Sequence, residues 1–346
     1  MNKEMMAAVL YGKENLRVEP VAVPKIGAGD LLVRVRAALT CGTDVKVFQR
    51  GYHARMIVPP AVFGHELAGD VVELGEGVTK FACGQRVVAA NSAPCHDCYY
   101  CRRGLENLCE NLLFNNGAYA EYIRIPARIV EKNTYAIPSH VGYQDAALAE
   151  PLACVLRGIE ETGIQPGDSV AVIGLGPIGQ MFVRMAKLAG ARVIALGRRQ
   201  SQLDRAAKLG AEEVIEVVEP AEAVSAVRAL TGGRGAEVAI EAVGTPVTWE
   251  MAAHMLRRGG TVNFFGGCPS DARVSLETSL LHYSEITCKA SFHHTPGHIQ
   301  RALEVISEGS VTAQDFVKGQ EPLKNMLEVM RYLMSHNGHM KTAIIP

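Results

Sequence analysis

The sequence lacks several features that would place it in other classes of protein. No apolar run approaches the roughly 20 residues that a membrane-spanning helix needs. There is no basic excess either, because the formal net charge is -1, whereas a protein that binds nucleic-acid phosphates usually carries one. No segment resembles a signal peptide. We therefore expect a cytoplasmic protein with neither a membrane nor a nucleic acid as its main partner.

The cysteines do not form the even set that a disulfide framework would need. There are nine of them, and without an export signal a disulfide-stabilised fold is not expected. Five fall in the stretch from Cys83 to Cys109, which points to metal. No internal repeat or low-complexity tract is present.

The chain is long enough for two domains, since 346 residues exceed one compact core. Up to about residue 150, short apolar runs between Gly and Pro residues predict an irregular β domain or barrel; they include 31–36, 69–74 and 86–90. Beyond Glu150-Pro151, strand candidates alternate with helical patterns such as 178–189 and 201–209. The strand candidates are 170–173, 192–196, 213–217, 237–242, 261–265 and 285–289. This alternation predicts an α/β fold with a doubly wound parallel sheet. The tail from about residue 290, with helical patterns at 299–307 and 323–334, could close back onto the first domain.

A glycine-rich turn follows the first of these strands. Gly174, Gly176 and Gly179, with Pro177 and Ile178 before the last, match G-x-G-x-x-G between a strand and a helix. The first glycine permits the tight turn, the second lets the backbone approach a pyrophosphate, and the third allows close helix–sheet packing. The helix N-terminus then faces the phosphates. The alternative is a plain strand-to-helix turn.

The end of the next strand bears on which dinucleotide fits. An acidic residue there would bind the ribose 2′-hydroxyl of NAD, but the chain reads Gly197-Arg198-Arg199. Guanidinium groups pair well with a phosphate dianion. The pattern therefore favours NADP over NAD, unless both arginines are solvated surface charges.

Two groups of residues are candidates for metal sites. Cys95, Cys98, Cys101 and Cys109 form C-x2-C-x2-C-x7-C, which is typical of a closed, structural zinc site; an iron–sulfur cluster is the competing interpretation. The second group is Cys41, His65, Glu66 and Glu150. Three such ligands with an open fourth position would make a catalytic zinc site. Spacing alone leaves this second site undecided, because a single Cys or His is more often a satisfied core residue.

Taken together and in this order, these motifs resemble the zinc-containing medium-chain alcohol dehydrogenases, and most closely the sorbitol and threonine dehydrogenase branch. The resemblance covers essentially the whole chain. It implies a GroES-like β-rich catalytic domain (1–154 and 290–346) interrupted by a Rossmann cofactor-binding domain (155–289), with the active site in the cleft between them. It also implies a homo-oligomer, either a tetramer or a dimer, with a contact expected near 270–283.

The resemblance assigns further roles. Cys41, His65 and Glu66 match the catalytic-zinc motif, and Glu150 matches an acidic position that ligates or approaches that zinc. Asp44 matches the carboxylate that orients the ligating His.

The resemblance also implies roles for positions outside the zinc motif. Thr43 matches the hydroxyl that passes the alcohol proton outward, and Lys341 matches a basic residue near the pyrophosphate. Lys46 stands where many members carry a His of the proton path. His293 and His294 lie where related enzymes place polar residues facing the cleft, with a surface location as the alternative.

The implied function is hydride transfer between a secondary alcohol or polyol and NADP(H), giving the ketone, with two zinc ions per chain. The alternatives are a related quinone or enone reductase without catalytic zinc, and a zinc-stabilised protein that only senses cofactor or docks a partner. The identity of the alcohol is not readable from the sequence.

Overall fold

The chain forms two compact units in the computed structural model, which describes residues 3–53, 55–335 and 339–346. The first unit comprises residues 1–153 and 294–346, and the second comprises residues 154–293. The sequence predicts these boundaries after residues 154 and 289, whereas the two units divide after residues 153 and 293. Among the described residues, no helix is both long and apolar enough to cross a membrane.

The first unit is built mainly of β-strands. A sheet of order β10-β6-β5-β3-β18-β17, to which β9 adds by pairing with β3, lies beside smaller sheets of order β2-β1-β4 and β7-β8. The strands are β1 (Glu4–Gly12), β2 (Asn15–Ala22), β3 (Leu31–Leu39), β4 (Ala61–Val62), β5 (Glu66–Leu74), β6 (Arg86–Ala89), β7 (Ser92–Ala93), β8 (Leu113–Phe114), β9 (Tyr122–Ile125), β10 (Thr134–Ala136), β17 (Val317–Pro322) and β18 (Lys341–Ile345).

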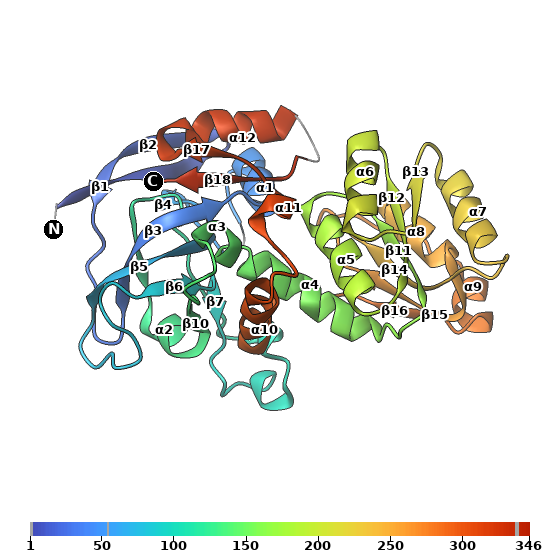
Figure 1. Cartoon of the computed structure of the whole chain (residues 1–346), viewed down its shortest axis with the longest axis horizontal. Helices are drawn as coiled ribbons and strands as arrows, with labels where there is room; N and C mark the ends of the chain where they lie inside the picture. Colours follow the sequence, from blue (N-terminus) through green and yellow to red (C-terminus); the bar gives the residue numbers. More distant parts are fainter. Residues whose placement is uncertain (1–2, 54, 336–338) are drawn as a thin grey trace. The chain divides into compact units, whose positions relative to one another are not determined.

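Short helices connect these strands. They are α1 (Gly42–Arg50), α2 (Ala127–Asn133), α3 (Tyr143–Ala146), α10 (Pro296–Ser307), α11 (Ala313–Phe316), α12 (Met326–Ser335) and the 3-10 turns η1 (Cys101–Arg103), η2 (Glu106–Leu108) and η3 (Leu323–Asn325). Helix α4 (Ala149–Thr162) contains the boundary between the units. The tail returns to the start of the chain, because β18 pairs antiparallel with β3 (Figure 1). The last segment therefore belongs to the first unit.

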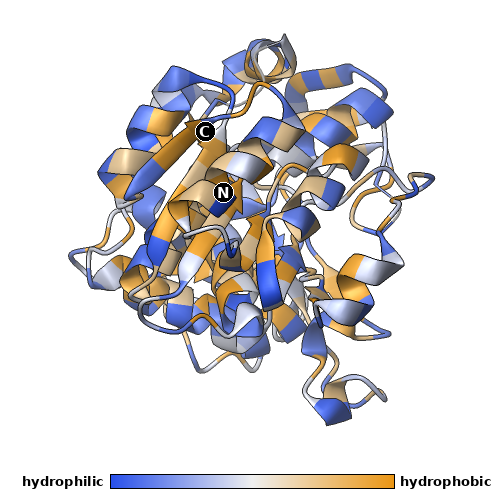
Figure 2. Ribbon diagram, turned by 90° about the vertical axis from the view of Figure 1, so that its right-hand side faces the viewer, coloured by the Kyte–Doolittle hydropathy of each residue, from blue (hydrophilic) through white to orange (hydrophobic). Residues whose placement is uncertain are grey.

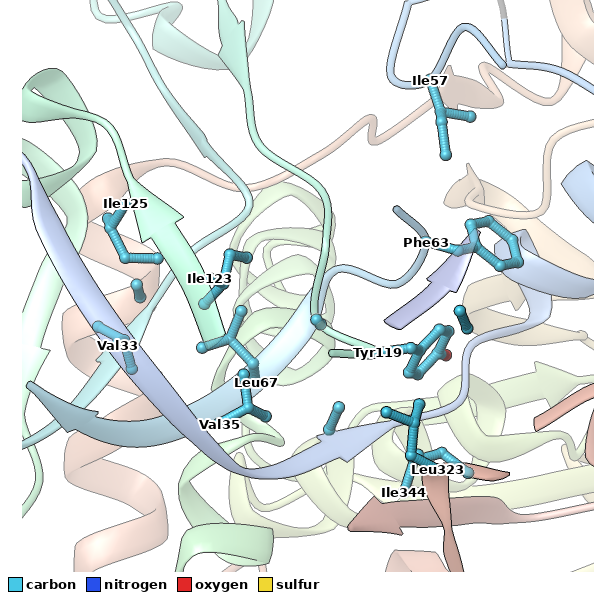
Figure 3. Close-up of a cluster of buried hydrophobic side chains, with 14 of the residues drawn as sticks. Val33, Val35, Ile57, Phe63, Leu67, Tyr119, Ile123, Ile125, Leu323 and Ile344 are labelled. Carbon is cyan, nitrogen blue, oxygen red and sulfur yellow. The ribbon is translucent and has the colours of Figure 1, made fainter. Parts of the chain in front are cut away.

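The hydrophobic core of the first unit joins side chains from neighbouring strands of its sheet. Val33, Val35 and Leu67 from β3 and β5 meet Ile344 from β18 in one buried cluster (Figure 3). In β3 every residue except Arg34 and Arg36 is buried, so the register of this strand is set by which side chains reach the cluster. The ring of Tyr119 lies in the same cluster, which places its hydroxyl beside the candidate site described below.

The second unit is the doubly wound parallel sheet that the βα alternation predicted. Its order is β13-β12-β11-β14-β15-β16, and every neighbouring pair is parallel. The strands are β11 (Ser169–Ile173), β12 (Arg192–Gly197), β13 (Glu213–Glu216), β14 (Ala236–Glu241), β15 (Leu256–Phe264) and β16 (Thr287–Lys289), and the helices are α5 (Pro177–Leu188), α6 (Gln200–Leu209), α7 (Pro220–Leu230), α8 (Pro246–His254) and α9 (Thr278–Tyr283). All six predicted strands are confirmed.

One strand begins earlier than the sequence suggests. β15 begins at Leu256 rather than at Thr261, and it runs through Gly259, whose φ is +69°. Two adjacent glycines read as a turn, but here they form an irregularity within the pairing to β14. The central strands β11 and β12 are almost fully buried, and Figure 2 shows hydrophobic residues concentrated on the strands. A parallel sheet covered on both faces requires this pattern.

Candidate functional site

Cys41 is positioned by the helix that follows it. It is the N-cap residue of α1, and its sulfur accepts a hydrogen bond from the Thr43 backbone N–H at 3.5 Å. The Asp44 side chain returns a bond by accepting the Cys41 N–H at 3.2 Å, which completes a capping box. The positive end of the helix therefore faces the sulfur.

His65 is held by Asp44 in a fully buried arrangement. The His65 Nδ1 and Asp44 Oδ1 atoms are 3.0 Å apart, and Tyr119 OH donates to Asp44 Oδ2 at 2.5 Å. Burial raises the pKa of Tyr119 and Asp44 reinforces this, so the hydroxyl stays protonated and donates. Because Asp44 occupies Nδ1, Nε2 is the ring nitrogen that a metal can use.

Gly64 explains how the Tyr119 ring reaches this position. Its φ is +89°, and a Cβ at Gly64 would lie 2.7 Å from the Tyr119 ring. A side chain at Gly64 would therefore displace the Tyr119 ring, whose hydroxyl contacts Asp44. The need for both a left-handed backbone and close ring contact explains glycine in Gly64-His65-Glu66.

Glu66 forms a buried ion pair with Lys341. The Lys341 Nζ atom lies 2.6 and 2.7 Å from the two Glu66 carboxylate oxygens and 3.1 Å from the Thr40 carbonyl oxygen. Burial opposes the Lys341 charge, but the Glu66 carboxylate outweighs it and raises the pKa of Lys341. Sheet register brings the pair together, because Glu66 at the start of β5 pairs with the end of β3, beside which β18 begins.

The resemblance implies a further role for Lys341, near the pyrophosphate of the cofactor. A lysine has three N–H donors, and here all three have acceptors in the first unit. None is left for a phosphate in this arrangement. Lys341 is only 3% exposed and balances the charge of Glu66.

Glu150 belongs to a second buried chain of polar groups. Asn91 Nδ2 donates to Glu150 Oε1 at 3.1 Å, and Asn91 Oδ1 lies 2.9 Å from His294 Nε2. Burial raises the pKa of Glu150, while His65 and Lys341 act against this shift. Of the two histidines considered from the sequence, His294 is buried and so does not take the surface location; His293 is half-buried with φ +66°.

The ligand atoms of Cys41, His65 and Glu66 all lie within 4.8 Å of one another. One thiolate, one imidazole and one carboxylate are ligand types that Zn²⁺ accepts, and three protein ligands leave a fourth position open. Glu150 does not belong to this set. Burial raises the pKa of Glu66 and the charge of Lys341 opposes this, while the nearby charge of Glu150 adds to the rise. The donor set therefore fits a zinc ion able to bind one further oxygen.

The four-cysteine loop brings its sulfurs to the spacing of a tetrahedral site. Sulfur–sulfur distances are 3.4 Å for Cys95–Cys109, 3.9 Å for Cys98–Cys109 and 4.0 Å for Cys95–Cys101. A Zn–S bond of about 2.3 Å implies sulfurs about 3.8 Å apart. An iron–sulfur cluster would need room for its own inorganic atoms between the thiolates, and this spacing leaves none.

Backbone N–H groups of the same loop stabilise a thiolate at Cys95. Hydrogen bonds from the Asp97 and Cys98 N–H groups lower the pKa of Cys95 to about 6. Burial instead raises the pKa of Cys101 to about 12. Without a cation the four thiols would not all ionise, so the loop fits a closed site that a metal completes.

The remaining residues of the predicted proton path lie on α1. Thr43 is half-buried two residues after Cys41, in the first turn of the helix. Lys46 is exposed on the next turn.

In the second unit, the glycine-rich turn has the close contacts that its glycines predicted. Gly174 has φ +92°, and a Cβ there would lie 2.4 Å from Val243 Cγ2. A Cβ on Gly179 would lie 1.7 Å from the Gly174 carbonyl oxygen, whereas Gly176 has nothing within 4 Å. Pro177 and Ile178 begin α5, whose first N–H groups have no partner within the helix. The turn thus fits a pyrophosphate at the helix N-terminus.

Arg198 and Arg199 are exposed where β12 ends at Gly197. Gly197 itself packs on the turn, since a Cβ there would lie 2.8 Å from Leu175 Cδ1. Arg198 and Arg199 therefore directly follow a residue that packs on the glycine-rich turn. In folds of this type, the end of this strand is where the adenosine ribose binds.

Sequence reasoning missed Tyr119 and Asn91. Tyr119 lies in an apolar Ala118-Tyr119-Ala120 run that reads as core, and Asn91 follows a strand as a loop residue would. The available signal was a polar group within or beside an apolar run expected to be buried, because such groups need partners.

Comparisons with known proteins agree with this geometry. A family model described as alcohol dehydrogenase GroES-like domain matches residues 27–138, and one described as zinc-binding dehydrogenase matches residues 177–308. Sorbitol dehydrogenase of Bacillus subtilis is 30% identical over 99% of this chain and 98% of its own length. L-threonine 3-dehydrogenase of Bacillus licheniformis is 37% identical over 73% of each chain. The crystal structure of a protein from Sinorhizobium meliloti described as a zinc-binding dehydrogenase, bound to NADP, superimposes with a TM-score of 0.89 at 30% identity and covers 100% of both chains.

Proposed function

The chain belongs to the family of zinc-containing medium-chain alcohol dehydrogenases, and from this premise we propose that it converts a secondary alcohol or polyol to the ketone with NADP⁺ as the preferred oxidant. The oxidation moves one hydride to the nicotinamide and releases one proton. The observation that carries the proposal is the joint presence of the Cys41–His65–Glu66 ligand set and the glycine-rich turn. A reductase that acts without a catalytic metal has no need of that ligand set.

We infer that Cys41, His65 and a carboxylate hold the catalytic zinc. Held by these residues, a zinc ion would polarise the oxygen of a bound alcohol and lower its pKa. Asp44 keeps the His65 ring in the tautomer that presents Nε2, and Tyr119 and the Cys41 N–H keep Asp44 in place. Lys341 balances the charge of Glu66, which limits the negative charge of the ligand set.

The proton of the alcohol leaves through Thr43. Its hydroxyl accepts the proton at Oγ1 and passes it outward, which fits its half-buried place between Cys41 and the exposed Lys46. Glu150 lines the site as a second carboxylate, oriented by Asn91. A carboxylate, an amide and the His294 imidazole together favour a substrate with more than one hydroxyl group.

The dinucleotide supplies the hydride acceptor, and its pyrophosphate would lie at the N-terminus of α5. Arg198 and Arg199 would pair with the 2′-phosphate of NADP. The Cys95–Cys98–Cys101–Cys109 loop would hold a second zinc, which stabilises the fold without an open position. A homo-oligomer remains the expectation for the assembly, and analytical ultracentrifugation tests it.

The decisive experiment is a screen of secondary alcohols, polyols and their ketones with NADP⁺ or NAD⁺, followed by reduced-nicotinamide absorbance. We expect turnover of hydroxylated substrates and a higher kcat/KM for NADP⁺ than for NAD⁺. Absence of any substrate-dependent change in absorbance would exclude the proposed activity, and a clear preference for NAD⁺ would exclude the role of the two arginines.

A further inference from the structure

Glu241 is a buried acid of the second unit that the proposed chemistry does not use. It is the last residue of β14 and its side chain is 0% exposed. It pairs in the sheet with Ile173 at the end of β11 and with Phe264 at the end of β15. A carboxyl group in the middle of a parallel sheet is costly to bury and calls for a physical explanation.

This residue ties together two loops at the carboxyl edge of the sheet. Its Oε1 accepts the backbone N–H groups of Val243 at 2.8 Å and Gly244 at 2.9 Å. Its main-chain carbonyl accepts those of Phe265 at 3.0 Å and Gly266 at 2.8 Å. Side chain and main chain of one residue therefore fix the loops 243–244 and 265–267.

The two loops pack around the carboxylate at backbone contact. A Cβ on Gly266 would lie 2.4 Å from the Gly244 nitrogen and 2.7 Å from Glu241 Oε2, and a Cβ on Gly244 would lie 2.5 Å from the Gly267 carbonyl oxygen. Neither glycine therefore tolerates a side chain without separating the loops.

The burial of the second carboxylate oxygen of Glu241 costs free energy. Oε2 is buried and makes no hydrogen bond with any residue that the structure describes. Burial raises the pKa of Glu241, while the nearby Gly244, Thr248, Val243 and Trp249 groups act against this shift. An amide or hydroxyl would avoid much of that cost, so stability alone does not explain a carboxylate here.

The loop 243–244 also touches the glycine-rich turn directly. The Val243 Cγ2 atom lies 2.4 Å from where a Gly174 Cβ would be, and the Ala242 N–H donates to the Ile173 carbonyl at 2.8 Å. Strands β11 and β14 are where the strand order reverses. Ligands of doubly wound sheets bind outside the strand ends at this point.

We propose that Glu241 is a positioning residue for the dinucleotide. It holds the loops 243–244 and 265–267 in the positions in which they border the cofactor site beside the glycine-rich turn. The inference rests on the proposed function, since it presupposes that a dinucleotide binds at this turn. It predicts that loss of the acceptor oxygen Oε1 weakens cofactor binding in molecules that are still folded.

A tryptophan side chain contacts one of these loops and can report its position by fluorescence. Trp249 is the only tryptophan of the chain. Its Nε1 donates to the Gly266 carbonyl at 2.9 Å, and its ring stacks on Phe264 with centroids 4.1 Å apart. Tryptophan emission therefore reports the position of loop 265–267, and it also provides a binding signal.

Glu237 offers a matched control on the same strand. It lies at the opposite end of β14, where its carboxylate accepts the Ser169 N–H at 2.8 Å and pairs with Arg257 at 3.0 Å. Glu237→Ala removes the same group from the same strand, but away from the glycine-rich turn. A purely structural role of strand carboxylates would affect both variants alike.

The test is a titration of Glu241→Ala, Glu241→Gln, Glu237→Ala and the wild type with NADP⁺, followed by Trp249 emission. We expect Glu241→Ala to raise the Kd about tenfold or more, since two hydrogen bonds to a charged acceptor are lost, and to shift the emission of the free protein. Glu241→Gln retains an acceptor oxygen and restores most of the affinity. Glu237→Ala lowers the melting temperature and leaves the Kd unchanged.

Two results would overturn the inference. The first is a folded Glu241→Ala variant with the Kd of the wild type. If that variant does not fold, Gly266→Ala takes its place, because its Cβ separates the same loops while the carboxylate stays; an unchanged Kd there refutes the inference equally. A wild type that binds neither NADP⁺ nor NAD⁺ refutes the proposed function itself, which distinguishes the two failures.

Discussion

Replacing Tyr119 by Phe isolates one hydrogen bond of the candidate zinc site. The Tyr119 hydroxyl lies 2.5 Å from Asp44 Oδ2 and 3.1 Å from the Leu39 carbonyl oxygen, so its single proton serves the shorter contact. Phe retains the ring, which packs edge-on against Phe63 with centroids 5.8 Å apart. Asp44 keeps its bonds to the Cys41 N–H and to His65.

The size of the effect follows from the charge on the acceptor. A hydrogen bond to a charged group contributes about 1.5–3 kcal/mol, against about 0.5–1.5 kcal/mol for a neutral pair. Tyr135→Phe is a matched control, because the Tyr135 hydroxyl donates to a neutral acceptor, the Pro296 carbonyl, at 2.9 Å. We expect Tyr119→Phe to lower the free energy of unfolding by about 1.5–3 kcal/mol and Tyr135→Phe by about 0.5–1.5 kcal/mol.

The assay is urea denaturation of the zinc-loaded variants, read as a shift in midpoint at an unchanged slope. Release of zinc to a chelator provides a second measurement, since loosening the group that orients a ligating His costs about 10-fold or more in metal affinity. A Tyr119→Phe variant no less stable than Tyr135→Phe, with unchanged zinc release, would show that Tyr119 does not support Asp44.

Three further substitutions test separate parts of the account. Replacing Arg198 and Arg199 together by Ala lowers kcat/KM for NADP⁺ about 10–100-fold and spares NAD⁺; steady-state kinetics with both cofactors decide this, and equal losses would contradict it. Cys98→Ser removes one zinc per chain and lowers the melting temperature by about 10 °C, whereas Ser at the exposed Cys83 changes neither; metal analysis and calorimetry check both variants. Gly179→Ala abolishes dinucleotide binding with zinc content intact, because its Cβ would lie 1.7 Å from the Gly174 oxygen; normal affinity in a titration would refute this reasoning.

The second unit was largely predictable because its signals are local. Alternating strand and helix patterns and a glycine turn at a strand end determine a doubly wound sheet within a few residues of each boundary. The error at β15 has a local cause as well, because Gly259 and Gly260 are typical of turns but here lie within a paired strand.

The polar partners of the candidate site were not predictable in the same way. Lys341 meets Glu66 across 275 residues, Tyr119 meets Asp44 across 75, and His294 meets Asn91 across 203. Such contacts depend on sheet register and chain return, which no short pattern encodes. The resemblance supplied the candidate ligands and Asp44, but not Tyr119 or Asn91, which contact Asp44 and Glu150.

The most direct test of the central claim is the metal content and turnover of Cys41→Ser beside the wild type. The account predicts two zinc ions per wild-type chain, and one zinc ion, unchanged NADP⁺ affinity and no turnover for the variant. A variant that keeps near-normal turnover, or a wild type that is active with only one zinc ion, would contradict the catalytic-zinc assignment.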